Sequence, residues 1–226
     1  MASIKFTNPH WEALTPETQS AFRMIGSLPL IQRFYLAGGS GLALHLGHRF
    51  SVDLDFFSTF EDAVNLDERT ILLNELADPT FFTTYDNDGT FVASWRNVGI
   101  SFFRMSVYPL ALSTLLLEGV PVASLPEIGA MKLAAIIDRG TRKDMVDLFF
   151  ILKQVPLEEL FRVASIKYPH ARTFAISASR ALAYFVDAES LPMPQMLDHT
   201  SWKTMKRFLE LQAIEVGRKN LVGYWE

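Results

Sequence analysis

Two aspartates within an apolar run are the residues of this chain best suited to chemistry. In segment 51–57 (SVDLDFF), Asp53 and Asp55 alternate with apolar residues. Residues i and i+2 of a strand share a face, so the two carboxylates should project side by side, roughly 7 Å apart. Adjacent carboxylates repel each other unless a cation lies between them, and Mg²⁺ prefers such oxygen ligands, completed by phosphates and water. The pair predicts a magnesium site; a solvated strand face is the alternative interpretation.

A glycine-rich turn precedes the aspartates by about a dozen residues. Residues 34–36 (FYL) favour a short strand, Gly38 and Gly39 a tight turn, and Ser40 the N-cap of a helix that runs to Leu46. Glycine lets the backbone approach a ligand closely, and the first free amides of a helix attract phosphate. The segment therefore predicts a phosphate site close to the carboxylates, although a Gly-Gly-Ser triplet by itself is most often an ordinary turn.

Together the two segments resemble a known superfamily. Gly-Gly-Ser followed by Asp-x-Asp resembles the catalytic signature of polymerase-β-type nucleotidyltransferases. The longer string 38–57, GGSGLALHLGHRFSVDLDFF, resembles the branch that contains the AbiEii/AbiGii-type toxins. The resemblance implies that Gly38, Gly39 and Ser40 bind nucleotide phosphates, and that Asp53 and Asp55 are catalytic residues that bind Mg²⁺.

A second group of charged residues lies at 132–148 and follows the pattern Lys-x6-Arg-x3-Lys-Asp-x2-Asp-Leu. Gly140 should end one helix, and Thr141 with Asp144 three positions later resembles a capping box that starts the next. Lys143 and Asp147 are i, i+4 neighbours and could pair. Charged residues on helix faces are normally only solvated, but this pattern matches a downstream motif of the same toxin branch.

The resemblance gives these downstream residues roles in the reaction. It implies that Lys132 contacts the triphosphate and that Asp144 is an additional base or a structural acid near the substrate. Arg139 and Lys143 would assist with the nucleotide charge or orient Asp144. Nucleotidyl transfer depends on positioning and charge neutralisation, and metal, lysine and backbone amides supply both.

One expected carboxylate is missing. Polymerase-β-type enzymes commonly add a third metal carboxylate from a later strand, but the sequence has no Asp or Glu between Asp88 and Glu118. The expected strand, 100–105 (ISFFRM), offers only serine and arginine as polar groups. Either Asp144 replaces the missing base, or one metal suffices, or the protein binds nucleotide without transferring it.

Composition limits the class of protein. The 226 residues are 49% hydrophobic, so they can form a substantial core, and the net charge of −4 gives no overall basic field for nucleic acid. The absence of cysteine excludes disulfides and thiolate catalysis. We find no secretory signal and no apolar segment long enough to span a membrane, so we expect a cytoplasmic protein.

The remaining segments indicate how the site is positioned. Apolar residues at helical spacing follow Thr15-Pro16, which predicts a helix that starts there. Asn87-Asp88-Gly89 between apolar runs predicts a hairpin. Pro121 argues that 115–122 is an edge strand. The expected helices are 16–25, 40–46, 66–76, 126–138, 141–153, 157–166, 173–186 and 201–218, and the other expected strands are 81–85, 91–95 and 100–107.

The remaining histidine and basic residues give weaker signals of function. His45 and His48 are better explained as helix-end and turn residues than as ligands, whereas Arg49 could pair with Asp53 or with a phosphate. A solvated helix face explains the C-terminal basic residues at least as well as a tRNA-binding patch does; they are Lys203, Lys206, Arg207, Arg218 and Lys219.

The sequence therefore predicts an α+β protein: a polymerase-β-like nucleotidyltransferase domain with a small mixed sheet over 1–124, followed by an all-helical domain over 125–226. The expected function is Mg²⁺-dependent transfer of NMP from an NTP to an acceptor hydroxyl. The resemblance implies tRNA as the acceptor and, as partner, an antitoxin with a DNA-binding domain. A catalytically weakened nucleotide-binding module that acts through a protein partner is the alternative.

Overall fold

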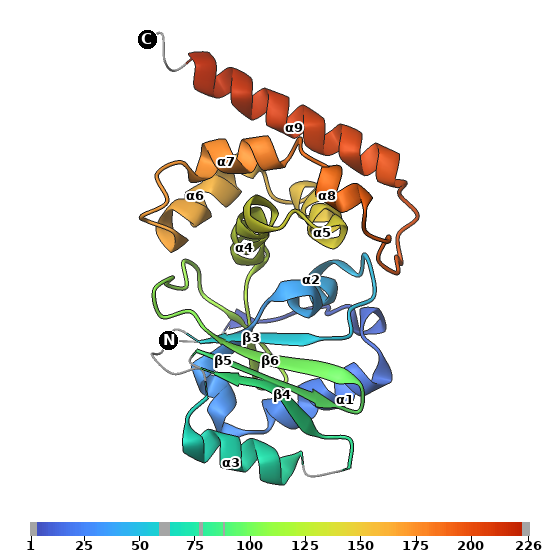
Figure 1. Cartoon of the computed structure of the whole chain (residues 1–226), viewed down its shortest axis with the longest axis vertical. Helices are drawn as coiled ribbons and strands as arrows, with labels where there is room; N and C mark the ends of the chain where they lie inside the picture. Colours follow the sequence, from blue (N-terminus) through green and yellow to red (C-terminus); the bar gives the residue numbers. More distant parts are fainter. Residues whose placement is uncertain (1–3, 59–63, 77–78, 88, 223–226) are drawn as a thin grey trace. The chain divides into compact units, whose positions relative to one another are not determined.

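The computed structural model describes residues 4–58, 64–76, 79–87 and 89–222 (Figure 1). The chain divides into two compact units, Met1–Ser124 (the N-terminal unit) and Leu125–Glu226 (the C-terminal unit). The first combines a mixed sheet with helices, and the second is helical. This is the α+β fold class that the sequence predicts.

Within the described residues, the sheet of the N-terminal unit has eight strands in the order β1-β7-β8-β2-β3-β6-β5-β4. Strand β3 is central: it pairs antiparallel with β2 and parallel with β6. The strands are β1 Ile4–Lys5, β2 Phe34–Leu36, β3 Leu54–Ser58, β4 Phe82–Asn87, β5 Thr90–Trp95, β6 Val98–Arg104, β7 Leu115–Leu117 and β8 Val120–Val122. The helical segments are η1 Trp11–Ala13, α1 Pro16–Gly26, η2 Pro29–Arg33, α2 Gly38–Leu46 and α3 Leu66–Glu75.

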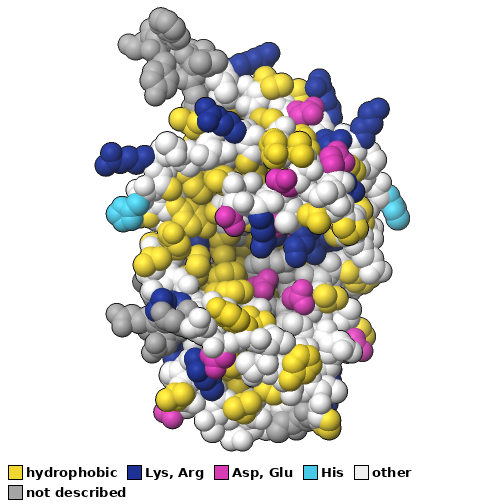
Figure 2. All heavy atoms as spheres, in the orientation of Figure 1, with side chains coloured by type: hydrophobic (Ala, Val, Ile, Leu, Met, Phe, Trp, Pro, Cys, Tyr) yellow, Lys and Arg dark blue, Asp and Glu magenta, His cyan; other side chains and the backbone are white. Residues whose placement is uncertain are grey.

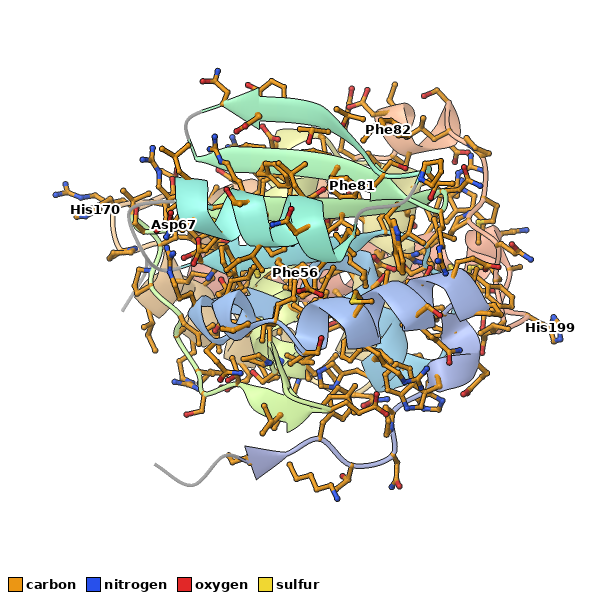
Figure 3. All side chains as sticks on the ribbon, turned by 90° about the horizontal axis from the view of Figure 1, so that it is seen from below. Phe56, Asp67, Phe81, Phe82, His170 and His199 are labelled. Carbon is orange, nitrogen blue, oxygen red and sulfur yellow. The ribbon has the colours of Figure 1, made fainter. Side chains whose placement is uncertain are left out.

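One face of this sheet carries the core. Figure 3 looks onto it from below, with α1 and α3 in front of the strands and Phe56 between them. The ring of Phe102 stacks on Phe56, with centroids 5.1 Å apart, and meets Phe34 edge-on at 4.9 Å. All three side chains are almost completely buried. Alternation along β3 then turns Asp55 to the opposite face, where α2 lies.

Local signals explain the helix ends of this unit. Thr15 caps α1 by accepting a hydrogen bond from the Thr18 amide at 3.2 Å, with Pro16 at the first helical position, as predicted. Gly47 ends α2 in the left-handed conformation, with φ of 59°. Glu68 and Asn65 form a capping box that starts α3.

The 115–122 segment differs from the prediction. It is a hairpin of two strands, β7 and β8, which turns at Glu118 and Gly119 with φ of 46° and 86°. Strand β8 is internal, between β7 and β2, although Pro121 suggested an edge. The proline is tolerated because the pairing of β8 with β2 is confined to Leu36 and Val122. The predicted turn residue Asp88 lies outside the described residues; Asn87 and Thr90 pair on either side of it.

The C-terminal unit is a cluster of six helices in the described residues. They are α4 Leu125–Asp138, α5 Arg142–Leu152, α6 Leu157–Lys167, α7 Phe174–Ala181, α8 Val186–Glu189 and α9 Trp202–Val222. Gly129 lets α4 pack closely on its neighbours, since a Cβ there would lie 2.5 Å from Leu160 and 3.2 Å from Ile151. Within the described ranges, none of the helices combines the length and the apolar character that crossing a membrane requires.

The predicted helix 173–186 is broken in two. Helix α7 ends at Ala181, a turn follows, and α8 begins at Val186. Contacts distant in sequence hold the second piece: the ring of Phe185 meets Trp202 edge-on at 5.9 Å, and Arg142 Nε donates to the Ala188 carbonyl at 2.8 Å. Tertiary packing therefore overrides a pattern that favoured one continuous helix.

Candidate active site

The glycine turn begins helix α2 three residues earlier than a Ser40 cap would. Ala37 is the N-cap and Gly38 the first helical residue, with φ of +61°. Only glycine adopts this conformation without strain. Ser40 therefore lies inside the first turn, and its predicted N-cap role is wrong. Ala37 has no polar side chain, so the first amides of α2 keep the capacity to bind an anion.

Ser40 instead ties the turn to the aspartate segment. Its Oγ is buried, donates to the backbone carbonyl of Asp53 and shares a hydrogen bond of 3.0 Å with the Ser51 Oγ. The amide of Ala37 donates to the Asp55 carbonyl at 3.0 Å. Two segments separated by a dozen residues are thereby fixed against each other, which makes Ser40 a residue that positions Asp53.

Asp55 lies directly against the turn. A Cβ atom placed on Gly38 would lie 2.6 Å from Asp55 Oδ2, closer than real contacts allow. Gly38 is thus required twice, by its φ and by the carboxylate beside it. The sequence predicted that a phosphate would approach the backbone at the glycines. At Gly38, the Asp55 carboxylate fills part of that space.

Asp53 lies just before β3, which begins at Leu54 and not at Ser51. A Cβ on Gly99 would lie 2.6 Å from Asp53 Oδ1. The parallel register pairs Leu54 with Ile100 and Asp55 with Ser101, so Gly99 and Ser101 accompany Asp53 and Asp55 on one face. Asp53 is exposed and Asp55 half-buried.

Gly99 is a site residue that sequence reasoning missed. The strand expected from the sequence begins at residue 100 and leaves Gly99 out, but β6 already begins at Val98, and the turn is at Arg96 and Asn97, both with positive φ. A glycine inside a strand often marks a close approach of another group. This signal could have identified it.

Ser101 stands where a third carboxylate would be expected, because it is the direct neighbour of Asp55 on the parallel strand. In the described part of the chain, no group of three or more His, Cys, Asp or Glu side chains could hold a metal ion. Asp53 and Asp55 nevertheless match the way Mg²⁺ is commonly held, by one or two carboxylates with phosphates and water. The donor set fits a metal that arrives with a nucleotide.

The second cluster lies within the C-terminal unit, where α4 meets α5. Lys132 Nζ lies 2.8 Å from Asp144 Oδ1 and 2.6 Å from Asp147 Oδ2. Arg139 donates to both oxygens of Asp144, at 2.9 and 3.2 Å. The side chains of Asp144 and Asp147 are 0% exposed and that of Lys132 only 7%. The sequence motif is therefore a buried ion-pair network that joins two helices.

Thr141 contributes half of the predicted capping box. It is the N-cap of α5 and accepts from the Asp144 amide at 3.4 Å, while its hydroxyl lies 2.5 Å from Asp144 Oδ2. The carboxylate of Asp144 thus receives the threonine hydroxyl as well as Lys132 and Arg139. The predicted pairing of Lys143 with Asp147 is wrong: Asp147 pairs with Lys132, and Lys143 is exposed.

The charges of this network set its protonation. Burial by itself would raise the pKa of Asp144, but the Lys132 charge and the hydrogen bonds from Arg139, Lys132 and Thr141 outweigh it and lower the pKa to about 2. Burial likewise opposes the charged form of Lys132, but Asp147 and Asp144 together raise its pKa. Asp144 and Lys132 are therefore both ionised near neutral pH.

The two histidines lie at the end of α2: His45 is in its last turn and His48 follows Gly47, which ends it. His45 stacks on Phe6 with centroids 4.4 Å apart, and its Nε2 bonds the Ala123 carbonyl at 2.9 Å. Burial lowers the pKa of His45, against the opposing effect of the Ala123 bond. His48 is buried.

A comparison with known protein families identifies the family of this chain. The model of the family "Nucleotidyl transferase AbiEii toxin, Type IV TA system" matches residues 22–216. The chain belongs to the AbiEii family. It is a nucleotidyltransferase with the polymerase-β-like fold that the two signatures predicted.

One relative in sequence and two solved structures are similar to this AbiEii-family chain. An uncharacterized protein of Aquifex aeolicus, aq_aa25, is 32% identical over 206 residues, which covers 89% of this chain and 97% of the relative. MenT4, a nucleotidyltransferase toxin from Mycobacterium tuberculosis, superimposes with a TM-score of 0.61 at 18% identity and covers 89% of this chain and 83% of its own. A crystal structure from H. pylori gives 0.55 at 18% identity, over 91% and 96%.

The site of this AbiEii-family member gives a first testable expectation. Gly99→Ala should lower nucleotidyl transfer about tenfold or more, because the new Cβ displaces the Asp53 carboxylate. Alanine in a strand interior is otherwise tolerated better than glycine, so the free energy of unfolding should change by less than about 1 kcal/mol. In an Asp53→Ala background the same substitution should cost no further activity. Equal losses in both backgrounds would contradict this explanation.

Proposed function

We propose that this AbiEii-family nucleotidyltransferase transfers NMP from an NTP to a hydroxyl of tRNA, with Mg²⁺, as the toxin of a toxin–antitoxin pair. Its family is described as belonging to a type IV toxin–antitoxin system. The partner we propose is an antitoxin with a DNA-binding domain. The acceptor hydroxyl would attack the α-phosphorus, the bond to the bridging oxygen of pyrophosphate would break, and the hydroxyl proton would leave to solvent or a base.

The observation that carries this proposal is the packing of Asp55 and Asp53 against two glycines. Gly38 admits Asp55 beside the amides of α2, and Gly99 admits Asp53 on the same face. A divalent ion at these two carboxylates would supply neutralisation of phosphate charge and orientation of the phosphates. The chain itself supplies rigidity, since β3 pairs with strands on both sides.

The first turn of α2 is the proposed phosphate site. Gly38, Gly39 and Ser40 supply backbone amides at the positive end of a helix, where phosphate binds favourably. Ser40 keeps the turn in place through Ser51 and the Asp53 carbonyl. Preorganised donors of this kind contribute to catalysis because they need no reorganisation during the reaction.

The C-terminal cluster receives a positioning role in this proposal. A carboxylate with a pKa of about 2 is a poor proton acceptor near neutral pH, so Asp144 is better suited to hold its neighbours than to act as the base. The guanidinium side chain of Arg139 is 54% exposed, which makes it the most accessible member of the network. Lys143 is exposed as well. The contacts of Arg139 and Lys143 with nucleotide charge stay predictions.

Lys132 is the residue whose predicted role the geometry favours least. Lys132 Nζ lies 2.8 Å from a carboxylate oxygen of Asp144 and 2.6 Å from one of Asp147, so its charge already has two anionic partners inside the C-terminal unit. This charge helps to keep Asp144 ionised. We therefore assign Lys132 to positioning, and its contact with the triphosphate stays a prediction.

The choice of tRNA as acceptor rests on the family and not on a basic surface. Figure 2 shows Lys and Arg side chains over α9 with Asp and Glu among them. Two basic residues of α9 form ion pairs: Lys206 lies 2.5 Å from Glu189, and Arg207 lies 3.7 Å from Glu210. This mixed charge supports a solvated helix face in preference to a tRNA-binding patch, so RNA contacts would have to come from elsewhere.

Ser101 favours one second candidate. A serine beside Asp55 leaves the site with two carboxylates, so the chain could bind nucleotide with weak turnover and act through a protein partner. This module would show Mg²⁺-dependent NTP binding with little or no product.

Both candidates are tested by one experiment. The purified chain is incubated with each of the four α-³²P-labelled NTPs and Mg²⁺, with total tRNA or total protein as acceptor, and with EDTA as a metal control. We expect label on tRNA from one preferred NTP, lost in Asp53→Ala and Asp55→Ala. Label on protein would move the acceptor to another class. No label on either, with NTP binding intact by titration, would replace the transferase proposal with the binding module.

A further inference from the structure

Arg49 is a buried cation that the proposed mechanism has not yet used. It lies between α2 and β3, and only 5% of the residue is exposed. Its guanidinium extends back to the glycine turn: a Cβ on Gly39 would lie 2.8 Å from Arg49 Nη2 and 3.6 Å from its Cζ. The same Cβ would lie 2.9 Å from Ser51 Oγ. Gly39 is therefore the residue that admits this guanidinium to the turn.

The side chain is held in place by the backbone. Arg49 Nη1 donates to the carbonyl of Phe50 at 2.9 Å, which fixes the plane of the guanidinium against the turn. A guanidinium carries five N–H donors, so it can keep such contacts and still donate to a phosphate. Its planar, permanently charged group matches phosphate oxygens in pairs, which an ammonium group cannot do.

The two glycines of the turn thus have different neighbours. Gly38 faces the carboxylate of Asp55, and Gly39 faces the guanidinium of Arg49. A negative group for a metal and a positive group for phosphate therefore lie against adjacent residues of one turn. A nucleotide that carries both a metal and phosphates requires these two charges side by side.

Burial also argues for a use of this charge. Desolvating a cation is unfavourable unless anionic groups compensate. A structural role for Arg49, as a counter-charge to acidic groups of the same unit, is the competing explanation. The two explanations differ in what they predict for ligands: a counter-charge supports the fold, whereas a phosphate contact changes affinity with the number of phosphates.

We propose that Arg49 binds the phosphate chain of the nucleotide, from the Gly39 side of the turn. The proposal rests on the proposed nucleotidyltransferase function and adds a phosphate-contact residue to its N-terminal site. It also supplies, within the N-terminal unit, the positive charge that the sequence assigned to Lys132.

The test is a titration of phosphate number. Binding of the preferred NTP and of its NDP, NMP and nucleoside forms is measured by calorimetry with Mg²⁺ for wild type, Arg49→Lys and Arg49→Met. The matched control is Arg23→Met, because Arg23 is an exposed arginine of the same unit, paired with Glu118. We expect Arg49→Met to weaken NTP binding about tenfold or more and nucleoside binding less than twofold. Arg49→Lys should recover part of the loss, and Arg23→Met should match wild type.

Each result of the titration either supports or overturns phosphate binding by Arg49. Equal loss for nucleoside and NTP, or no loss for either, would show that Arg49 is only a counter-charge. If thermal unfolding shows that Arg49→Met does not fold, Arg49→Lys decides alone, since it keeps the charge and loses the paired donors; unchanged NTP affinity in that variant would overturn the proposal. A wild-type chain that binds no NTP would overturn the proposed function itself, which is a different result from a variant that binds as wild type does.

Discussion

Asp55→Asn should reduce the rate of nucleotidyl transfer by about 10²–10³-fold, the loss typical of removing one preorganised charge from a phosphoryl-transfer site. The asparagine keeps the shape of the side chain but gives up its charge and one acceptor oxygen. Asp55 is rigidly placed, because β3 is paired on both sides and Oδ2 abuts Gly38. A substitute therefore cannot move to compensate.

The matching change at Asp53 should have a smaller effect on the rate. Asp53 is exposed and precedes the strand, so its carboxylate has more freedom to be replaced by water. Single-turnover rates at saturating NTP measure both variants, and a separate titration gives NTP affinity. Asp67→Asn provides the control: it makes the same chemical change at an exposed position in the first turn of α3 and should retain wild-type rates.

Stability should change little in Asp55→Asn. Removing one of two neighbouring carboxylates also removes their mutual repulsion, so we expect a shift in the free energy of unfolding within about 1 kcal/mol. Retention of the rate to within about threefold, in a folded Asp55→Asn protein, would mean that the Asp-x-Asp pair is not the metal site. A large loss in Asp67→Asn would show that the measurement responds to charge in general.

Features that depend on a few consecutive residues could be predicted from the sequence. Thr15 with Pro16 marks a helix start, the helix that follows the glycine turn ends at Leu46 as expected, and the alternation around Asp55 marks a strand that turns this carboxylate from the core. In each case the physical cause is local: a cap, a left-handed residue or a period of two. The family likewise followed from motifs whose members lie close in sequence.

Features that depend on distant partners could not be predicted. Whether Ser40 caps a helix or bonds the Asp53 carbonyl depends on where β3 lies, which local spacing does not specify. Gly99 matters only because the parallel register brings Asp53 beside it. Asp147 was assigned to Lys143 by helix spacing, but an inter-helix pair with Lys132 replaced that local one.

These differences also change how the second motif is interpreted. Its residues were assigned individual contacts with nucleotide, yet the structure joins four of them in one network: Lys132, Arg139, Asp144 and Asp147. A motif can be retained because its members satisfy each other in the interior. The activity of such residues is then tested only together with their stability.

Lys132→Met should lower the free energy of unfolding of the C-terminal unit by about 3–5 kcal/mol, the usual cost of leaving buried charges without their partner. Methionine preserves the length and apolar stem of lysine but leaves Asp144 and Asp147 buried without the ammonium group. Arg139 still donates to Asp144 in this variant. Urea unfolding followed by circular dichroism and tryptophan fluorescence measures the change.

Two matched variants identify the cause. Lys143→Met removes an exposed lysine from α5 and should change the free energy of unfolding by less than about 0.5 kcal/mol. Lys132→Met combined with Asp147→Asn should recover part of the loss in the free energy of unfolding. The second substitution removes the negative charge of Asp147 together with the positive charge of Lys132. If Lys132 is instead a triphosphate contact, Lys132→Met would keep wild-type stability and lose NTP affinity. That pattern would return Lys132 to the nucleotide site, whereas a destabilised single variant rescued by the second substitution establishes it as the residue that holds α4 to α5.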